Sequence, residues 1–197
     1  QGDLKATLIQ DPRPSPDKSK IAASVLTKIY VVDADGENLK RLTKSNQNEF
    51  KPIWSPDGRW IAYTTWSHAR GGHIYKMRAD GKGKPRQLTD IEAFYTDLTF
   101  SPDGSMIVAM RGNEFLRNQT FSEFGGLRIP LELISLPAKG GEQTVIKALD
   151  SGRYPHFGPE ADRVYLTGDD GLFSLTLRGT DYRDEMTVNA PRGNRRG

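Results

Sequence analysis

Short stretches that are apolar or alternate between apolar and polar residues recur along the chain, and none keeps a helical period. They include residues 60–64, 74–77, 106–110, 164–166 and 172–175. Runs of about 4–8 residues that are rich in β-branched and aromatic side chains and bounded by Gly, Pro or Asp are typical of β-strands. The pattern therefore predicts an all-β chain.

A turn motif recurs between these stretches. Ser-Pro-Asp stands at residues 15–17 and Ser-Pro-Asp-Gly at residues 55–58 and 101–104, while residues 158–161, Gly-Pro-Glu-Ala, form a degraded fourth copy. Proline presets φ for the second turn position, aspartate can accept hydrogen bonds from nearby backbone N–H groups, and glycine tolerates positive φ. We expect a turn between two strands at each copy.

A second marker follows each turn motif. Residues 33–36 and 78–81 end in Asp-Gly, a hairpin signal, and residues 137–141 and 177–180 are weaker copies. Two markers that recur in one order, with a period of roughly 40–50 residues, are typical of a propeller. Each unit is predicted to be a four-stranded antiparallel meander.

The fold class predicted is an all-β β-propeller of four-stranded antiparallel blades, with four blades present as part of a larger ring. An open stack would expose apolar faces and edges, so further blades are expected to complete it. The predicted units are residues 1–10 as an outer strand of a neighbouring or closing blade, 11–43 as blade 1, 44–89 as blade 2, 90–146 as blade 3 with an inserted loop over 111–130, 147–190 as blade 4, and 191–197 as a basic tail or linker.

An aromatic residue precedes three of the turns. Packing between neighbouring blades is favoured over a ring of ligand-stacking aromatics, because a repeated apolar residue at one blade position is what such packing needs. The residues assigned to the structural repeat are Trp54, Asp57, Gly58, Phe100, Asp103, Gly104 and Phe157.

The second unit carries the fullest copy of the repeat, at residues 52–58, 61–63, 74–81 and 86–89. These residues resemble the TolB-like, WD-repeat-like β-propeller family. The resemblance implies the fold and suggests export to the periplasm or the extracellular space. It does not imply one activity, because propellers host unrelated functions.

A finer resemblance concerns residues 123–125, 152–157, 171–175 and 179–181. They look like the N-terminal propeller of bacterial proteins that carry a metal-dependent amidohydrolase domain. This resemblance implies an alternative in which the propeller supports a catalytic domain elsewhere.

Composition excludes several classes of function. The 197 residues contain no cysteine, which excludes a disulfide framework and thiolate metal sites. No apolar run approaches the length of a membrane span, and no signal peptide is recognised. The formal net charge is +3. The clearest basic cluster, residues 192–197, is interpreted as a solvated linker because aromatics do not interleave it, with contact to nucleic acid or an acidic partner as the alternative. No nucleic-acid partner is predicted.

The histidines give little support for a metal or catalytic site. His68 and His73 share a glycine-containing loop without a paired-ligand motif, and His156 is expected to pack between blades rather than to face the axial channel. Asp33, Asp35, Asp169 and Asp170 are interpreted as hairpin residues, with a loose calcium site as the alternative. No nucleophile elbow or phosphate-binding glycine loop is present. We therefore predict no catalytic residue, no metal ligand and no cofactor.

The least repeat-like segment covers residues 111–130. Its aromatic and arginine side chains are of the types that anchor interfaces, although a self-packed rim loop is the alternative. The candidate partner-binding residues are Phe115, Arg117, Phe121, Phe124 and Arg128.

These observations favour a non-catalytic module that acts as a protein-binding or scaffold unit. Its partner would be another protein or the further blades that complete the ring. One alternative is the propeller portion of an exported metal-dependent amidohydrolase-like or peptidase-like enzyme. A second is a structural subunit whose open blade edges pair into homo-oligomers.

Overall fold

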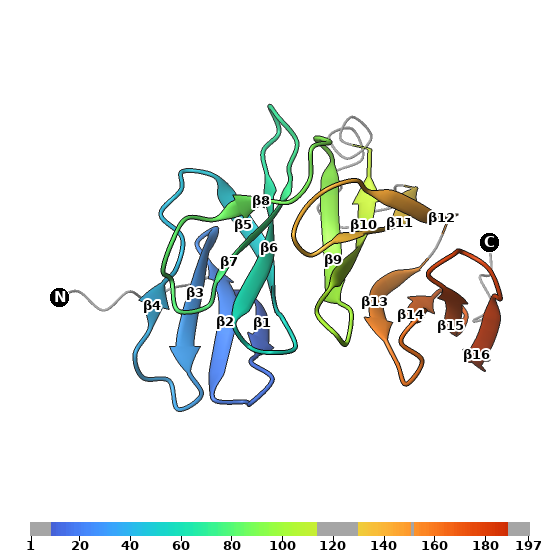
Figure 1. Cartoon of the computed structure of the whole chain (residues 1–197), viewed down its shortest axis with the longest axis horizontal. Coiled ribbons are helices and arrows are strands. Elements are labelled where there is room, and N and C mark those ends of the chain that lie inside the picture. The colour runs from blue at the N-terminus through green and yellow to red at the C-terminus, as the bar shows by residue number, and fades with distance from the viewer. Residues whose placement is uncertain (1–8, 114–129, 151, 189–197) are drawn as a thin grey trace, which may run out of the picture.

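The computed structural model describes residues 9–113, 130–150 and 152–188, and all regular secondary structure in these residues is β-strand (Figure 1). The strands form four antiparallel sheets of four strands, and each sheet follows chain order from one edge to the other. The predicted fold of four-stranded antiparallel blades is confirmed. No helix in the described part of the chain is long and apolar enough to cross a bilayer.

The strand bounds, blade by blade, are β1 (Ile9–Pro14), β2 (Lys20–Val25), β3 (Lys28–Asp33) and β4 (Lys40–Arg41) in blade 1; β5 (Asn48–Trp54), β6 (Trp60–Trp66), β7 (Ile74–Arg78) and β8 (Arg86–Gln87) in blade 2; β9 (Phe94–Phe100), β10 (Met106–Gly112), β11 (Leu131–Pro137) and β12 (Thr144–Leu149) in blade 3; and β13 (Arg153–Phe157), β14 (Arg163–Gly168), β15 (Gly171–Thr176) and β16 (Arg183–Thr187) in blade 4.

Two of the predicted unit boundaries differ from the strands. Ile9 and Gln10 pair with Val25 and Ser24, so they belong to the first strand of blade 1 and not to an outer strand over residues 1–10. The reason is that a Ser-Pro-Asp turn needs a strand on each side, and β1 supplies the earlier one. The outer strand of blade 3 runs to Leu149, beyond the predicted end at residue 146. Residues 1–8 and the tail at 191–197 lie outside the described residues.

In blades 1 to 3 the turn between the first and second strands contains the Ser-Pro-Asp motif, and the same hydrogen bonds stabilise it in each blade. In blade 2 the N–H of Gly58 donates to the carbonyl of Ser55 at 2.9 Å, and the Ser55 hydroxyl donates to the Asp57 carboxylate at 2.5 Å. That carboxylate also accepts the N–H of Arg59 at 3.0 Å. Lys18 takes the glycine position in blade 1 with φ of 61°, a left-handed conformation that is uncommon outside glycine.

Apolar side chains join consecutive blades through three clusters. Side chains alternate between the two faces of a strand, so neighbouring residues of β6 point to different blades. Ile61 and Tyr63 pack with blade 1, whereas Ala62 packs with blade 3. The third cluster joins Val108 and other blade 3 residues to Val164 and other blade 4 residues. The core therefore lies between blades.

The three aromatics before the turns lie at these junctions. Phe100 is 8% exposed in the cluster between blades 2 and 3. Trp54 and Phe157 are half-buried. Trp54 packs against the cluster between blades 1 and 2, and Phe157 packs against the cluster between blades 3 and 4. The indole N–H of Trp54 also donates to the carbonyl of Arg13 in blade 1 at 2.9 Å.

Blade 1, drawn in blue, and blade 4, drawn in orange and red, lie on opposite sides of the molecule (Figure 1). None of the three apolar clusters contains residues from both of these blades. Each terminal blade therefore has one face that no other described blade covers.

Candidate functional site

The turn aspartates serve the fold. Hydrogen bonds from the neighbouring serine hydroxyl, and then from backbone N–H groups, lower the pKa of Asp17, Asp57 and Asp103 to about 2. These carboxylates are ionised and already hydrogen-bonded within their own turns. They have the features of turn residues rather than of acids or bases that act on a substrate.

Each of the three histidines contacts a different neighbour. His73 Nδ1 lies 3.2 Å from the hydroxyl of Thr89, and the ring of His68 meets Trp66 edge-on with centroids 6.2 Å apart. His156 is exposed and stacks on Tyr165 with centroids 5.8 Å apart, so its expected burial between blades is wrong. The cause is that no other described blade packs against this face of blade 4. Within the described ranges, no group of three His, Cys, Asp or Glu residues could hold a metal ion.

The inserted loop of blade 3 is only partly described. Arg111, at its start, forms an ion pair with Glu132 at 2.6 Å. The five candidate partner-binding residues, Phe115, Arg117, Phe121, Phe124 and Arg128, lie in residues 114–129, outside the described residues. Their role stays a prediction.

A row of polar residues on the first strands of the blades is a feature that sequence reasoning missed. Asp11, Lys51, Asp97 and Tyr154 each lie three residues before the last residue of their strand, and their φ values are 51°, 54°, 51° and 56°. Each sits where the strand pairing shifts register, which identifies a β-bulge. These first strands contact one another from blade to blade, so we call the four residues the axial row. A polar residue at one fixed distance before each turn was the available signal.

An ion-paired lysine connects three blades in the axial row. The Lys51 ammonium lies 3.2 Å from Asp11 Oδ1 in blade 1 and 3.7 Å from Asp97 Oδ1 in blade 3. The Asp97 side chain is 6% exposed, whereas Lys51 is 32% exposed. The lysine thus bridges two carboxylates that would otherwise repel each other.

The face of blade 1 that no other described blade covers carries mostly apolar side chains, with Lys28 and Arg41 also placed on it by the strand register. We call it the blade 1 face, and strand register places Ile9, Ile21, Val25, Tyr30 and Val32 on it. The equivalent face of blade 2, which carries Ile61 and Tyr63, is covered because it packs against blade 1. On the blade 1 face, Ile9 is 62% exposed, Ile21, Tyr30 and Val32 are half-buried, and Val25 is 9% exposed. Apolar surface of this kind marks a contact with another protein element.

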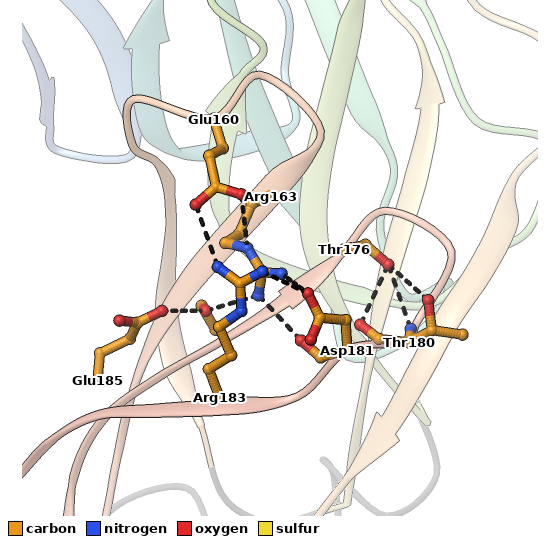
Figure 2. A network of polar contacts seen from close by, with 8 residues as sticks. Glu160, Arg163, Thr176, Thr180, Asp181, Arg183 and Glu185 are labelled. Atoms are coloured by element: carbon orange, nitrogen blue, oxygen red, sulfur yellow. Dashed lines mark hydrogen bonds and ion pairs between the residues drawn. The ribbon is translucent and has the colours of Figure 1, made fainter.

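The uncovered face of blade 4 is built around a buried arginine (Figure 2). Arg163 is 1% exposed, and its guanidinium donates to the Ser174 hydroxyl and to the Asp181 carbonyl, both at 2.9 Å. It also pairs with the carboxylates of Asp181 and Glu160. Arg183 contacts the same two carboxylates, at 2.6 and 3.3 Å, and closes the network. We call this surface the blade 4 face.

A groove lined by carboxylates lies where blades 3 and 4 meet. It has a volume of about 470 Å³, and we call it the acidic groove. Its apolar wall contains Phe173, whose ring stacks on that of Tyr182 with centroids 5.3 Å apart at 24°. Its carboxylates are Asp150, Asp169, Asp170 and Asp184.

Comparisons with known proteins point to one family. A family model described as the TolB beta propeller domain matches residues 5–125. The Tol-Pal system protein TolB of Thioalkalivibrio sulfidiphilus is 40% identical over 58 residues, which cover 29% of this chain and 13% of that protein. The uncharacterized peptidase YuxL of Bacillus subtilis is 27% identical over 110 residues, which cover 51% of this chain and 17% of that protein. The chain therefore spans less than a fifth of either relative.

A solved structure agrees on the fold. The putative TolB from Agrobacterium tumefaciens superposes with a TM-score of 0.72 at 15% identity, over 92% of this chain and 62% of that one. The family match covers more than half of the chain and includes the turn motifs of blades 1 to 3. This chain belongs to the TolB β-propeller family.

Proposed function

We propose that the chain acts as a non-catalytic protein-binding or scaffold unit. The observation that carries the proposal is the blade 1 face, which presents apolar side chains at positions that another blade covers in blades 2 to 4. Leaving apolar surface in water costs about 25 cal/mol per Å², so such a face is stabilised by a protein cover. The cover is either a further blade of the same repeat or a partner protein.

Photo-crosslinking in the native host tests this proposal. A photoreactive amino acid replaces Val32 on the blade 1 face, and the matched control replaces Val145, which is 46% exposed on the outer strand β12. We expect Val32 to crosslink to a protein segment that mass spectrometry identifies, and Val145 to react mainly with solvent. Equal, solvent-dominated reaction at both positions would contradict the proposal.

The relatives support a second candidate. A match to a protein named as a peptidase suggests that this chain is the propeller portion of an exported metal-dependent amidohydrolase-like or peptidase-like enzyme. The intact mass of the protein from its host, together with a hydrolysis assay on that intact protein, separates the two. This candidate requires a larger native polypeptide that hydrolyses a substrate, whereas the scaffold candidate requires no hydrolysis by either form.

The place of action proposed is the periplasm or the extracellular space, supported by the match to a Tol-Pal system protein. Cell fractionation with antibodies against the chain tests it. Recovery in the cytoplasmic fraction would contradict it.

A further inference from the structure

We propose that the acidic groove binds a basic polypeptide segment of a partner protein, with an arginine or lysine side chain lying over the ring of Tyr182. This inference rests on the proposed function and adds a second surface and a partner chemistry to it. Neither the repeat motifs nor the blade 1 face predicts this groove.

The charge of the groove is one-sided. Its four aspartates come from three separate segments: Asp150 from the connection after β12, Asp169 and Asp170 from the turn between β14 and β15, and Asp184 from β16. Among the described residues that line the groove, none is a lysine or an arginine. Carboxylates that are spread around one groove without a cation are complementary to a cationic partner.

The aromatic wall makes the groove more than a group of carboxylates. Tyr182 is 59% exposed, yet its ring lies nearly parallel to Phe173, which is buried in the cluster between blades 3 and 4. Partial burial and, after it, the neighbouring Asp184 carboxylate raise the pKa of Tyr182, so a negative charge lies close to the tyrosine hydroxyl. An exposed, fixed aromatic face beside carboxylates favours a guanidinium or ammonium group through cation–π attraction.

The groove suits a peptide better than a metal ion. No combination of three acidic or histidine side chains within the described residues comes close enough to hold a metal. Leu149, Leu172 and Phe173 supply apolar lining between the carboxylates, which matches the aliphatic stems of long basic side chains. An occupant that combines apolar contact with positive charge is therefore favoured.

Fluorescence anisotropy with defined peptides tests the proposal. The probe is a short labelled peptide in which arginine alternates with leucine, and the matched peptide has glutamate in place of arginine. We expect the arginine peptide to bind the intact chain with an affinity that falls as salt increases, and the glutamate peptide not to bind.

Two variants address the groove. The double substitution Asp169→Asn and Asp170→Asn is expected to weaken binding by about tenfold or more. Tyr182→Ala is expected to weaken it by about two- to fivefold. Circular dichroism on each variant checks that the blades remain folded.

Matched controls lie elsewhere on the surface. Tyr154→Ala removes a tyrosine of the same exposed fraction, 59%, and the double substitution Asp90→Asn and Glu142→Gln removes the same amount of charge. The controls are expected to leave the affinity unchanged. Equal affinities for groove and control variants, or no binding of the arginine peptide, would overturn the proposal. A crosslink at Val32 would still support the proposed function in that case, so the two failures are distinguishable.

Discussion

The blade 1 face is mostly apolar, whereas the blade 4 face carries a network of ion pairs around Arg163. Both are outer faces of terminal blades made from one repeat. On the blade 1 face, Ile21 lies opposite Val32 and Val25 opposite Ile9. On the blade 4 face, Tyr165 lies opposite Ser174, and Arg163 donates to that serine.

Aligned positions in the inner blades show where the difference arises. Tyr165 aligns with Ala62 and Val108, which pack against the next blade. Arg163 aligns with Trp60 and Met106. At these two positions blade 4 therefore carries a tyrosine and an arginine where blades 2 and 3 carry apolar side chains, and the arginine is hydrogen-bonded within its own blade.

The contrast disfavours head-to-tail stacking of copies. Such stacking would place the mostly apolar blade 1 face against charged groups of the blade 4 face, and removing those charges from water is costly without new partners. Head-to-tail assembly therefore has less support than a contact in which another protein, or the blade 1 face of a second copy, covers the blade 1 face.

The largest effect on folding stability is expected from Arg163→Met. Removing one member of a buried charge network costs about 3–5 kcal/mol in general, and we expect about 2–3 kcal/mol here because the carboxylate partners are about half exposed. Urea denaturation followed by circular dichroism measures the loss. Arg183→Met, at an exposed position of the same network, is the control and should cost clearly less. Equal losses would show that Arg163 is not the centre of the network.

A second effect concerns association through the blade 1 face. The double substitution Tyr30→Ser and Val32→Ser removes apolar area from an uncovered face, so it should reduce association while changing stability little. Sedimentation velocity over a range of concentrations measures it. Tyr165→Ser, on the blade 4 face, is the control and should leave association unchanged. A wild-type chain that stays monomeric at all concentrations would exclude a second copy of this chain as the cover of the blade 1 face.

Acid should reduce the stability that the turn aspartates give to blades 1 to 3. Blade 4 has Glu160 in place of the turn aspartate, so its turn should contribute less to this loss. The folded-state pKa of Asp17, Asp57 and Asp103 is about 2, below the ordinary value of 3.8. Their stabilising contribution is therefore complete above about pH 4 and is lost as the pH falls toward 2. Urea titrations at several pH values measure the slope, and Asp57→Asn should flatten it between pH 4 and 2. An unchanged slope in that variant would assign the acid sensitivity to other groups.

Much of the fold could be predicted because its signals are local. Turn chemistry at Ser55 to Gly58 and strand-length apolar runs such as residues 106–110 give the blades, their order and their meander topology. The start of β1 could not be placed as easily, because Ile9 and Gln10 carry no marker and their assignment depends on pairing with β2.

The candidate sites were harder to predict, because they depend on contacts between distant residues. His156 has no neighbour in sequence that shows whether a blade covers its face. The acidic groove joins Asp150 to Asp184 across two blades, and Asp169 alone is indistinguishable from an ordinary hairpin residue. Arg163 occupies a position that is apolar in blades 2 and 3, and that departure from the repeat was the available sign of the blade 4 network.

The smallest effect is expected at the axial row, where Lys51 ties blade 1 to blades 2 and 3. Tyr154 occupies the corresponding position in blade 4 and offers no charge to this arrangement. Because Lys51 is about one-third exposed, its coupling to Asp11 should be about 0.5–1 kcal/mol and should weaken with salt. A double-mutant cycle with Lys51→Met and Asp11→Asn, measured by urea denaturation, isolates that coupling. Hydrogen exchange adds the location: the single variant Lys51→Met should speed exchange in β1 to β3 and leave β14 and β15 unchanged. Faster exchange across all four blades would mean that Lys51 supports the whole stack rather than the attachment of its first blade.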